Sequence, residues 1–124
     1  MPIKSLRLTP PEPTEADIQR ASARRMQAAG YLVVRQNGGG FRDGRGRFVK
    51  NYLIAGLNAC AGLPDLLCFK GERFIMLEIK KRGGKLSAAQ LRFHAFAARF
   101  GVEVVIVEGV AGLDALAARL ESER

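Results

Sequence analysis

The sequence predicts a single α/β domain, in which a mixed β-sheet is flanked by α-helices. Its 124 residues are the length of one ordinary domain. Apolar patterns of helical and of strand spacing alternate along the chain, and no internal repeat divides it. We expect a flexible, proline-rich tail over residues 1–13 and one folded domain over residues 14–124.

The first helix is predicted to begin after Thr14, a good N-cap residue, with Asp17 at the capping-box position. Gly30 is expected to end this helix. Its expected apolar stripe consists of Ile18, Ala21, Met26 and Ala29. The β-branched residues that follow predict a short strand over residues 31–37.

A glycine-rich stretch, NGGGFRDGRGRFVKNYLIAGLNACA, occupies residues 37–61. Segments of this length without clear structure are usually functional or mobile in a compact domain. Its RFVKNYLIA part predicts an additional short strand over residues 47–55.

The second half of the chain predicts a hairpin, a helix, a strand and a last helix. Two apolar runs surround a KGER turn in residues 64–81, PDLLCFKGERFIMLEIKK. Residues 87–100 predict a helix that Gly101 ends, and residues 102–109 predict a buried strand, apolar near its start except at Glu103. The apolar stripe of the last helix consists of Leu113, Leu116, Ala117 and Leu120.

The net charge of +8 and the isoelectric point near 10.2 favour a polyanionic partner, and nucleic acid is the commonest one in a cell. The candidate DNA-binding residues form two clusters, one over residues 35–50 and one after the hairpin. They are Arg35, Arg42, Arg45, Arg47 and Lys50, followed by Lys81, Arg82 and Lys85. The alternative is a solvated loop with scattered charge.

Several classes of protein are disfavoured. No apolar run approaches the ~20 residues that span a bilayer, and the N-terminus lacks the apolar centre of a secretory signal. We therefore expect a cytoplasmic protein without a membrane partner. Cys60 and Cys68 lack CxxC spacing and the chain has one His, so neither a zinc site nor a disulfide framework is indicated.

The hairpin carries charged residues where a buried strand should be apolar. If Gly71 and Glu72 form a two-residue turn, antiparallel pairing places Asp65 directly opposite Glu78. Lys80, two residues further on, points to the same face as Glu78. A shift of one residue in the turn would move the two acids to opposite faces.

Two adjacent carboxylates beside apolar strands need compensation, because buried unpaired charge is costly. Mg²⁺ or Mn²⁺ would supply it, since Mg²⁺ binds one or two carboxylates, keeps several waters and accepts phosphate oxygens. This arrangement favours metal-assisted hydrolysis of a phosphodiester, with Lys80 orienting or deprotonating the water or stabilising the developing charge. The alternative is the solvated end of an edge strand.

Here the residues resemble a known pattern. PD at 64–65 and EIK at 78–80 resemble the PD-(D/E)xK nuclease signature. More closely, residues 15–108 resemble the VRR-NUC family in its stand-alone phage and bacterial form. The resemblance rests on RQNGGGFR, GRFVK, GLPD, LEIK, LSAAQ and GVEVVIVEG. It implies a restriction-endonuclease-like core.

The resemblance also implies roles for the site. Asp65 and Glu78 would be metal-binding acids, the backbone carbonyl of Ile79 a further ligand, and Lys80 the catalytic lysine. It further implies that Gln90 supports the site or contacts phosphate, and that Glu15 is an additional metal or water ligand.

These last two residues have structural alternatives. Ser87 and Gln90 have the spacing of a capping box, and Glu15 is a favourable acid in the first turn of a helix. His94 lies one helical turn beyond Gln90, where a packing or surface role is expected. Gln36 and Asn37 are left without a definite role.

By resemblance, the chain is expected to be a Mg²⁺- or Mn²⁺-dependent DNA endonuclease without an organic cofactor. Stand-alone members of the family are associated with homodimers that cut branched DNA such as four-way junctions. The alternatives are a monomeric nuclease of flaps or single strands, a basic nucleic-acid-binding module without catalysis, and a small structural protein with a basic surface.

Overall fold

The structure, a computed structural model, describes residues 11–36, 40–50 and 62–124. The predicted α/β class is confirmed. In chain order the elements are α1 (Glu15–Ala28), β1 (Leu32–Arg35), β2 (Gly40–Arg42), β3 (Phe48–Lys50), β4 (Leu66–Lys70), β5 (Arg73–Lys80), α2 (Ala88–Arg99), β6 (Glu103–Glu108) and α3 (Gly109–Ser122).

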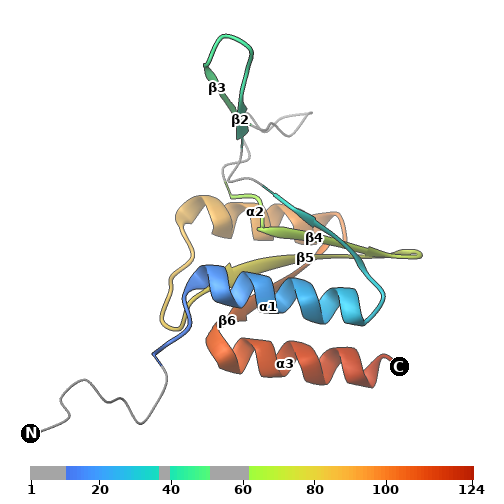
Figure 1. Ribbon diagram of the computed structural model, residues 1–124. Coiled ribbons are helices and arrows are strands. Elements are labelled where there is room, and N and C mark those ends of the chain that lie inside the picture. The colour runs from blue at the N-terminus through green and yellow to red at the C-terminus, as the bar shows by residue number, and fades with distance from the viewer. Residues whose placement is uncertain (1–10, 37–39, 51–61) are drawn as a thin grey trace, which may run out of the picture.

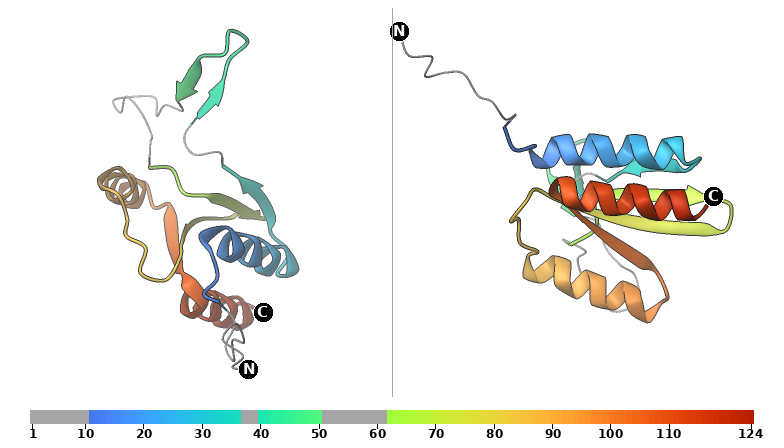
Figure 2. Two further views of the ribbon diagram at one scale, coloured as in Figure 1. Left: turned by 60° about the vertical axis from the view of Figure 1, so that its left-hand side comes forward. Right: turned by 90° about the horizontal axis from the view of Figure 1, so that it is seen from below.

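The main sheet of the described part is mixed and has four strands in the order β1-β4-β5-β6. β1, β4 and β5 pair antiparallel, whereas β6 runs parallel to β5. The helices α1 and α3 cover one face of this sheet and α2 lies on the other (Figures 1 and 2). β2 and β3 form a separate hairpin that projects away from the sheet (Figure 1).

The strand β5 lies between β4 and β6, and its side chains alternate between the two faces. Leu77 and Ile79 are completely buried in the core beneath α1 and α3. Met76 points the other way and packs in a smaller cluster with Phe93 and Ala97 of α2. Glu78 shares this second face, so the helix α2 lies over it.

The helix α1 begins as predicted, because both hydrogen bonds of the Thr14–Asp17 capping box are present. Ile18 and Met26 are buried as expected, but the third buried position of the helix is Ser22. The hydroxyl of Ser22 donates a 2.7 Å hydrogen bond to the carbonyl of Ile18. This bond satisfies the hydroxyl within the helix itself, so a serine replaces an apolar residue there.

The predicted register of the β4–β5 hairpin is confirmed. Lys70 pairs with Arg73, and Leu66 pairs with Leu77. Gly71 in the turn has a φ of +60°, a conformation that L-residues rarely adopt. The next pair outward from Leu66 and Leu77 joins the positions of Asp65 and Glu78.

The strand predicted over residues 102–109 is confirmed as β6, but the prediction that it is buried is wrong. Among the described strands β6 has one neighbour, β5, and lies at the edge of the sheet, with Ile106 45% exposed. Only Val107 is fully buried, because it faces the core beneath α3. Glu103 is bound at this edge by the guanidinium of Arg119, at 2.5 and 2.7 Å.

The glycine-rich stretch contains one strand that the sequence did not predict, β2, and the predicted strand over residues 47–55 is described only as β3. Residues 51–61 and 1–10 lie outside the described residues. Within the expected tail, the carboxylate of Glu12 forms a 2.7 Å ion pair with Arg82. No helix of the described part is long and apolar enough to cross a membrane.

Candidate active site

The centre of the site is Glu78, whose side chain is 1% exposed although it is an acid. It is buried because it lies near the end of β5, between two neighbouring strands, with α2 above it. A carboxylate in this position is costly unless other groups bind it. The partners of Glu78 therefore define what the site can do.

The helix α2 binds both carboxylate oxygens of Glu78. The side-chain nitrogen of Gln90 donates to Oε2 at 3.2 Å, and Nε2 of His94 lies 3.0 Å from Oε1. Gln90 also forms the predicted capping box, because its Oε1 accepts from the backbone N–H of Ser87 at 2.8 Å. The capping role and the contact with the site use opposite ends of one amide, so both roles coexist.

Asp65 comes to the same place from the start of β4. Its Oδ2 accepts a 2.7 Å hydrogen bond from the backbone N–H of Ile79. In an antiparallel pair the N–H and C=O of one residue project to the same neighbouring strand. The carbonyl of Ile79 therefore also opens toward the side on which Asp65 lies.

The pKa of Glu78 is raised to about 8, first by burial, then by a hydrogen bond with Asp65 and by the charge of Asp65, against a lowering effect of Lys80. The pKa of His94 is lowered, first by burial and then by the charge of Lys80. Both shifts favour the neutral forms. The contact between Glu78 and His94 is thus a hydrogen bond and not an ion pair.

Lys80 and Glu15 stand at the margin of this cluster. Lys80 ends β5 on the same face as Glu78 and is partly buried. Glu15 is exposed in the first turn of α1, and its charge makes the smallest contribution to the raised pKa of Glu78. The structure therefore brings Asp65, Glu78 and Lys80 together, with Glu15 more distant in its effect.

The residues fit a hard divalent cation. No group of three or more His, Cys, Asp and Glu side chains in the described part is arranged to hold a metal ion. The two carboxylates of Asp65 and Glu78, with the carbonyl of Ile79, are instead an all-oxygen set of the kind that Mg²⁺ prefers.

The candidate DNA-binding residues are exposed wherever the structure describes their side chains. Arg35 ends β1 beside the start of β4, near Asp65, and Lys81, Arg82 and Lys85 follow β5. Arg42 and Lys50 are described only as strand residues of the projecting hairpin.

The tip of the β2–β3 hairpin is organised by Asp43. Its Oδ1 accepts from the backbone N–H groups of Arg45 and Arg47, at 2.9 and 3.0 Å. Both arginines are exposed. The one acid of this cluster thus shapes the turn that presents its cations.

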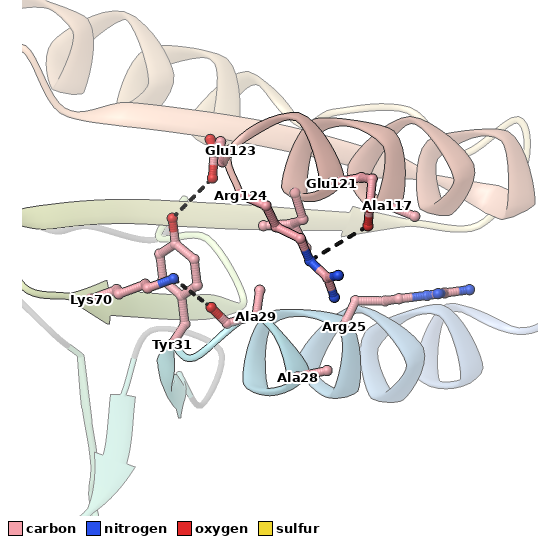
Figure 3. Close-up of a pocket in the computed structure, with 10 residues that line it drawn as sticks. Arg25, Ala28, Ala29, Tyr31, Lys70, Ala117, Glu121, Glu123 and Arg124 are labelled. Atoms are coloured by element: carbon pink, nitrogen blue, oxygen red, sulfur yellow. Dashed lines mark hydrogen bonds and ion pairs between the residues drawn. The ribbon is translucent and has the colours of Figure 1, made fainter.

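A cavity of about 260 Å³ lies at the opposite end of the sheet, beside the β4–β5 turn and the last turns of α1 and α3 (Figure 3). Its polar groups bond to one another: the hydroxyl of Tyr31 donates to Glu123 at 3.4 Å, and Lys70 donates to the carbonyl of Ala29 at 2.7 Å. The two acids that line it are paired with arginines, Glu121 with Arg124 and Glu123 with Arg73 and Arg119, so we do not place the chemistry there.

Sequence reasoning missed the contact of His94 with the site. The available signal was its position four residues after Gln90, which places both side chains on one face of α2. Helical spacing alone does not reveal that a buried acid lies beneath that face.

Comparisons with known proteins identify the family and the fold of this chain. The model of the VRR-NUC domain family matches residues 14–111. A solved structure described as a VRR_NUC domain is 23% identical, with a TM-score of 0.56 over 84% of this chain and 95% of its own. The structure of Hjc, a Holliday junction resolvase from Archaeoglobus fulgidus, is 22% identical, with a TM-score of 0.49 over 75% of this chain and 66% of its own.

A search of curated proteins found no match. The family match covers most of the chain, and the similar VRR_NUC structure confirms the fold independently. The predicted family and the α/β fold with a mixed sheet flanked by helices are thus confirmed. This chain belongs to the VRR-NUC family and is a nuclease domain.

Proposed function

We propose that this domain is a Mg²⁺- or Mn²⁺-dependent deoxyribonuclease whose site is the cluster around Glu78. The observation that carries the proposal is the buried carboxyl of Glu78 beside Asp65, with a pKa raised to about 8. Burying one acid beside a second, half-buried acid is costly unless a cation or a proton compensates the charge.

Asp65, Glu78 and the carbonyl of Ile79 would hold the metal ion. When bound, a divalent cation lowers the pKa of a water and stabilises the charge that develops on a phosphodiester. The protein keeps these ligands in place through the hydrogen bond from the N–H of Ile79 to Asp65 and through the contacts of α2 with Glu78. The site is therefore prearranged before substrate binds.

Lys80 would orient the attacking water, accept its proton or stabilise the phosphorane-like charge. Its position on the same face as Glu78 supports this role. Gln90 would hold Glu78, as its 3.2 Å contact indicates. Glu15 would bind a metal-coordinated water from the first turn of α1, consistent with its small effect on Glu78.

We further propose that the substrate is branched DNA and that the domain acts as a homodimer. Exposed cations flank both ends of the site, with Arg35 on one side and Lys81, Arg82 and Lys85 on the other. Two such sites in a dimer would reach two strands of a four-way junction. The resemblance to stand-alone VRR-NUC domains is the basis for choosing this substrate over flaps or single strands.

The test is cleavage of four-way junction, flap, single-stranded and linear duplex DNA, with Mg²⁺, Mn²⁺ or EDTA. We expect cleavage only with a metal ion and fastest on the junction, and a loss of roughly 10²-fold or more in Asp65→Ala and Lys80→Ala. The mass of the protein, measured by light scattering with and without DNA, tests the dimer.

Each part can fail separately. Equal cleavage by wild type and both variants would remove the site from the mechanism. Binding without cleavage of any substrate would favour the non-catalytic module. A monomeric protein that prefers flaps or single strands would leave the nuclease in place and overturn the substrate proposal.

A further inference from the structure

The inward face of α2 has an apolar half and a polar half. Phe93 and Ala97 are 7% and 5% exposed and pack on the sheet. Gln90 and His94 lie on the same face by their spacing, and both contact Glu78. The side chain of His94 is only 16% exposed. The helix therefore places a partly buried imidazole within hydrogen-bond distance of one carboxylate oxygen of Glu78.

We propose that His94 is a positioning residue for the nuclease site, acting through Glu78. Its Nε2 holds Oε1 of Glu78 while Gln90 holds Oε2, and the pair fixes the plane of the carboxyl group toward Asp65 and Ile79. This inference rests on the proposed function, because its consequence is the affinity of the site for a divalent cation.

The contacts of Gln90 and His94 together restrict the rotation of the Glu78 carboxylate more than either contact alone would. The terminal torsion of a glutamate is broad, so a carboxylate held at one oxygen still turns about its axis. Donors on both oxygens, supplied by one rigid helix, remove this freedom. Each carboxylate oxygen has about two lone-pair directions, so each donor leaves room for a cation on the same oxygen.

The chemical nature of the donor also fits. An imidazole N–H orients Glu78 as a neutral donor at 3.0 Å, whereas the charge of a lysine or arginine in that place would compete with the cation. Residues that orient metal ligands in this way typically change metal affinity ~10–100-fold when they are removed.

The test compares His94→Gln, His94→Asn and His94→Ala. The amide nitrogen of glutamine reaches about as far as Nε2, which contacts Glu78, whereas that of asparagine reaches only about as far as Nδ1. We expect calorimetric titration of Mn²⁺ into the DNA-free protein to show a dissociation constant raised ~10–100-fold in the Ala and Asn variants and restored toward wild type in the Gln variant.

Two further readouts separate positioning from packing. In cleavage assays the Mg²⁺ concentration for half-maximal rate should rise in the Ala and Asn variants, with most of the rate regained at saturating Mg²⁺. Thermal unfolding in EDTA reports the fold alone. Arg92→Ala, an exposed position on the same helix, is the matched control and should keep wild-type Mn²⁺ affinity.

The outcomes distinguish the two proposals. If the wild-type protein binds no Mn²⁺ and cleaves no DNA, the proposed function fails. If the wild type binds Mn²⁺ and the three variants bind it equally, His94 has no positioning role although the nuclease stands. The positioning role is also refuted if the Gln variant is stable in EDTA but binds Mn²⁺ no better than the Asn variant.

Discussion

At the scale of single residues, the site depends on one buried acid, Glu78. Glu78 occupies a position that an apolar residue would fill in an ordinary sheet, and its burial is costly. Gln90 and His94 contact its two oxygens, and the charge of Asp65 acts on it from nearby. These contacts lower the free-energy cost of burying the carboxylate but supply no positive charge. A bound cation would supply that charge.

The raised pKa of Glu78 predicts a pH dependence of stability without metal. Between about 4.5, the ordinary value, and about 8, the folded protein holds a proton that the unfolded chain releases. The free energy of unfolding therefore falls as pH rises, by up to ~1.4 kcal/mol per pH unit. The pKa of His94 is lowered, so its effect on the free energy of unfolding has the opposite sign. That effect is confined to pH values below its ordinary pKa of 6.5.

Between pH 6.5 and 8 the effect of Glu78 on stability is therefore separated from that of His94. Glu78→Gln removes the ionisation and keeps the shape, so we expect a stability that is flat in this range relative to wild type. Urea unfolding in EDTA at several pH values measures both slopes. Parallel slopes would show that Glu78 does not carry the proton.

At the scale of elements, α2 is placed by a backbone contact. A Cβ atom on Gly62 would lie 2.2 Å from the carbonyl oxygen of Ala89 and 2.6 Å from the backbone nitrogen of Gln90. No side chain fits there without moving the helix. The first turn of α2, which delivers Gln90 to Glu78, therefore rests directly on the segment that leads to Asp65.

We predict that Gly62→Ala displaces the start of α2. It should lower the free energy of unfolding by ~1–3 kcal/mol, as overpacking does, and should weaken Mn²⁺ binding because Gln90 moves away from Glu78. Gly44→Ala is the control, since a Cβ there would meet no atom within 4 Å. Chemical unfolding and Mn²⁺ titration of both variants are the measurements; equal behaviour would mean that the helix yields freely.

At the scale of the whole molecule, the charge is arranged around one end of the sheet. The cations after β5 and at the end of β1 flank the acids, and the β2–β3 hairpin carries further arginines away from the body (Figure 1). Ion pairs occur at both ends of the sheet, Glu123 with Arg73 and Arg119 at the far end and Glu12 with Arg82 at this one. The exposed cations beside the acids are the ones that a phosphate at the site would meet.

We predict that Arg45→Ala and Arg47→Ala weaken binding of DNA and lower its salt dependence. Each phosphate contact contributes about one unit to the slope of log affinity against log salt. Fluorescence anisotropy with labelled junction DNA in EDTA, at several salt concentrations, gives the slopes. Arg99→Ala, at the C-terminal end of α2, is the control, and an unchanged slope in the hairpin variants would remove that hairpin from the DNA surface.

Much of this molecule could be predicted because the signals are local. The turn at Gly71 determines the pairing of its two strands, and with it the opposition of Asp65 and Glu78. The capping boxes at Thr14 and Ser87 depend on residues three apart. Register and helix starts are thus written in short stretches of sequence, and the family motifs share this property.

The sequence alone determined that Asp65 and Glu78 lie opposite each other on two paired strands, that Lys80 is their neighbour, and that a helix begins after Ser87. Only the tertiary structure decided that β6 lies at an edge, that Gly62 touches α2, and that His94 meets Glu78. These facts depend on which elements become neighbours; His94 and Glu78, for example, are 16 residues apart in the chain. Packing between segments that are distant in the sequence determines these contacts, and the residue spacing within one segment does not predict them.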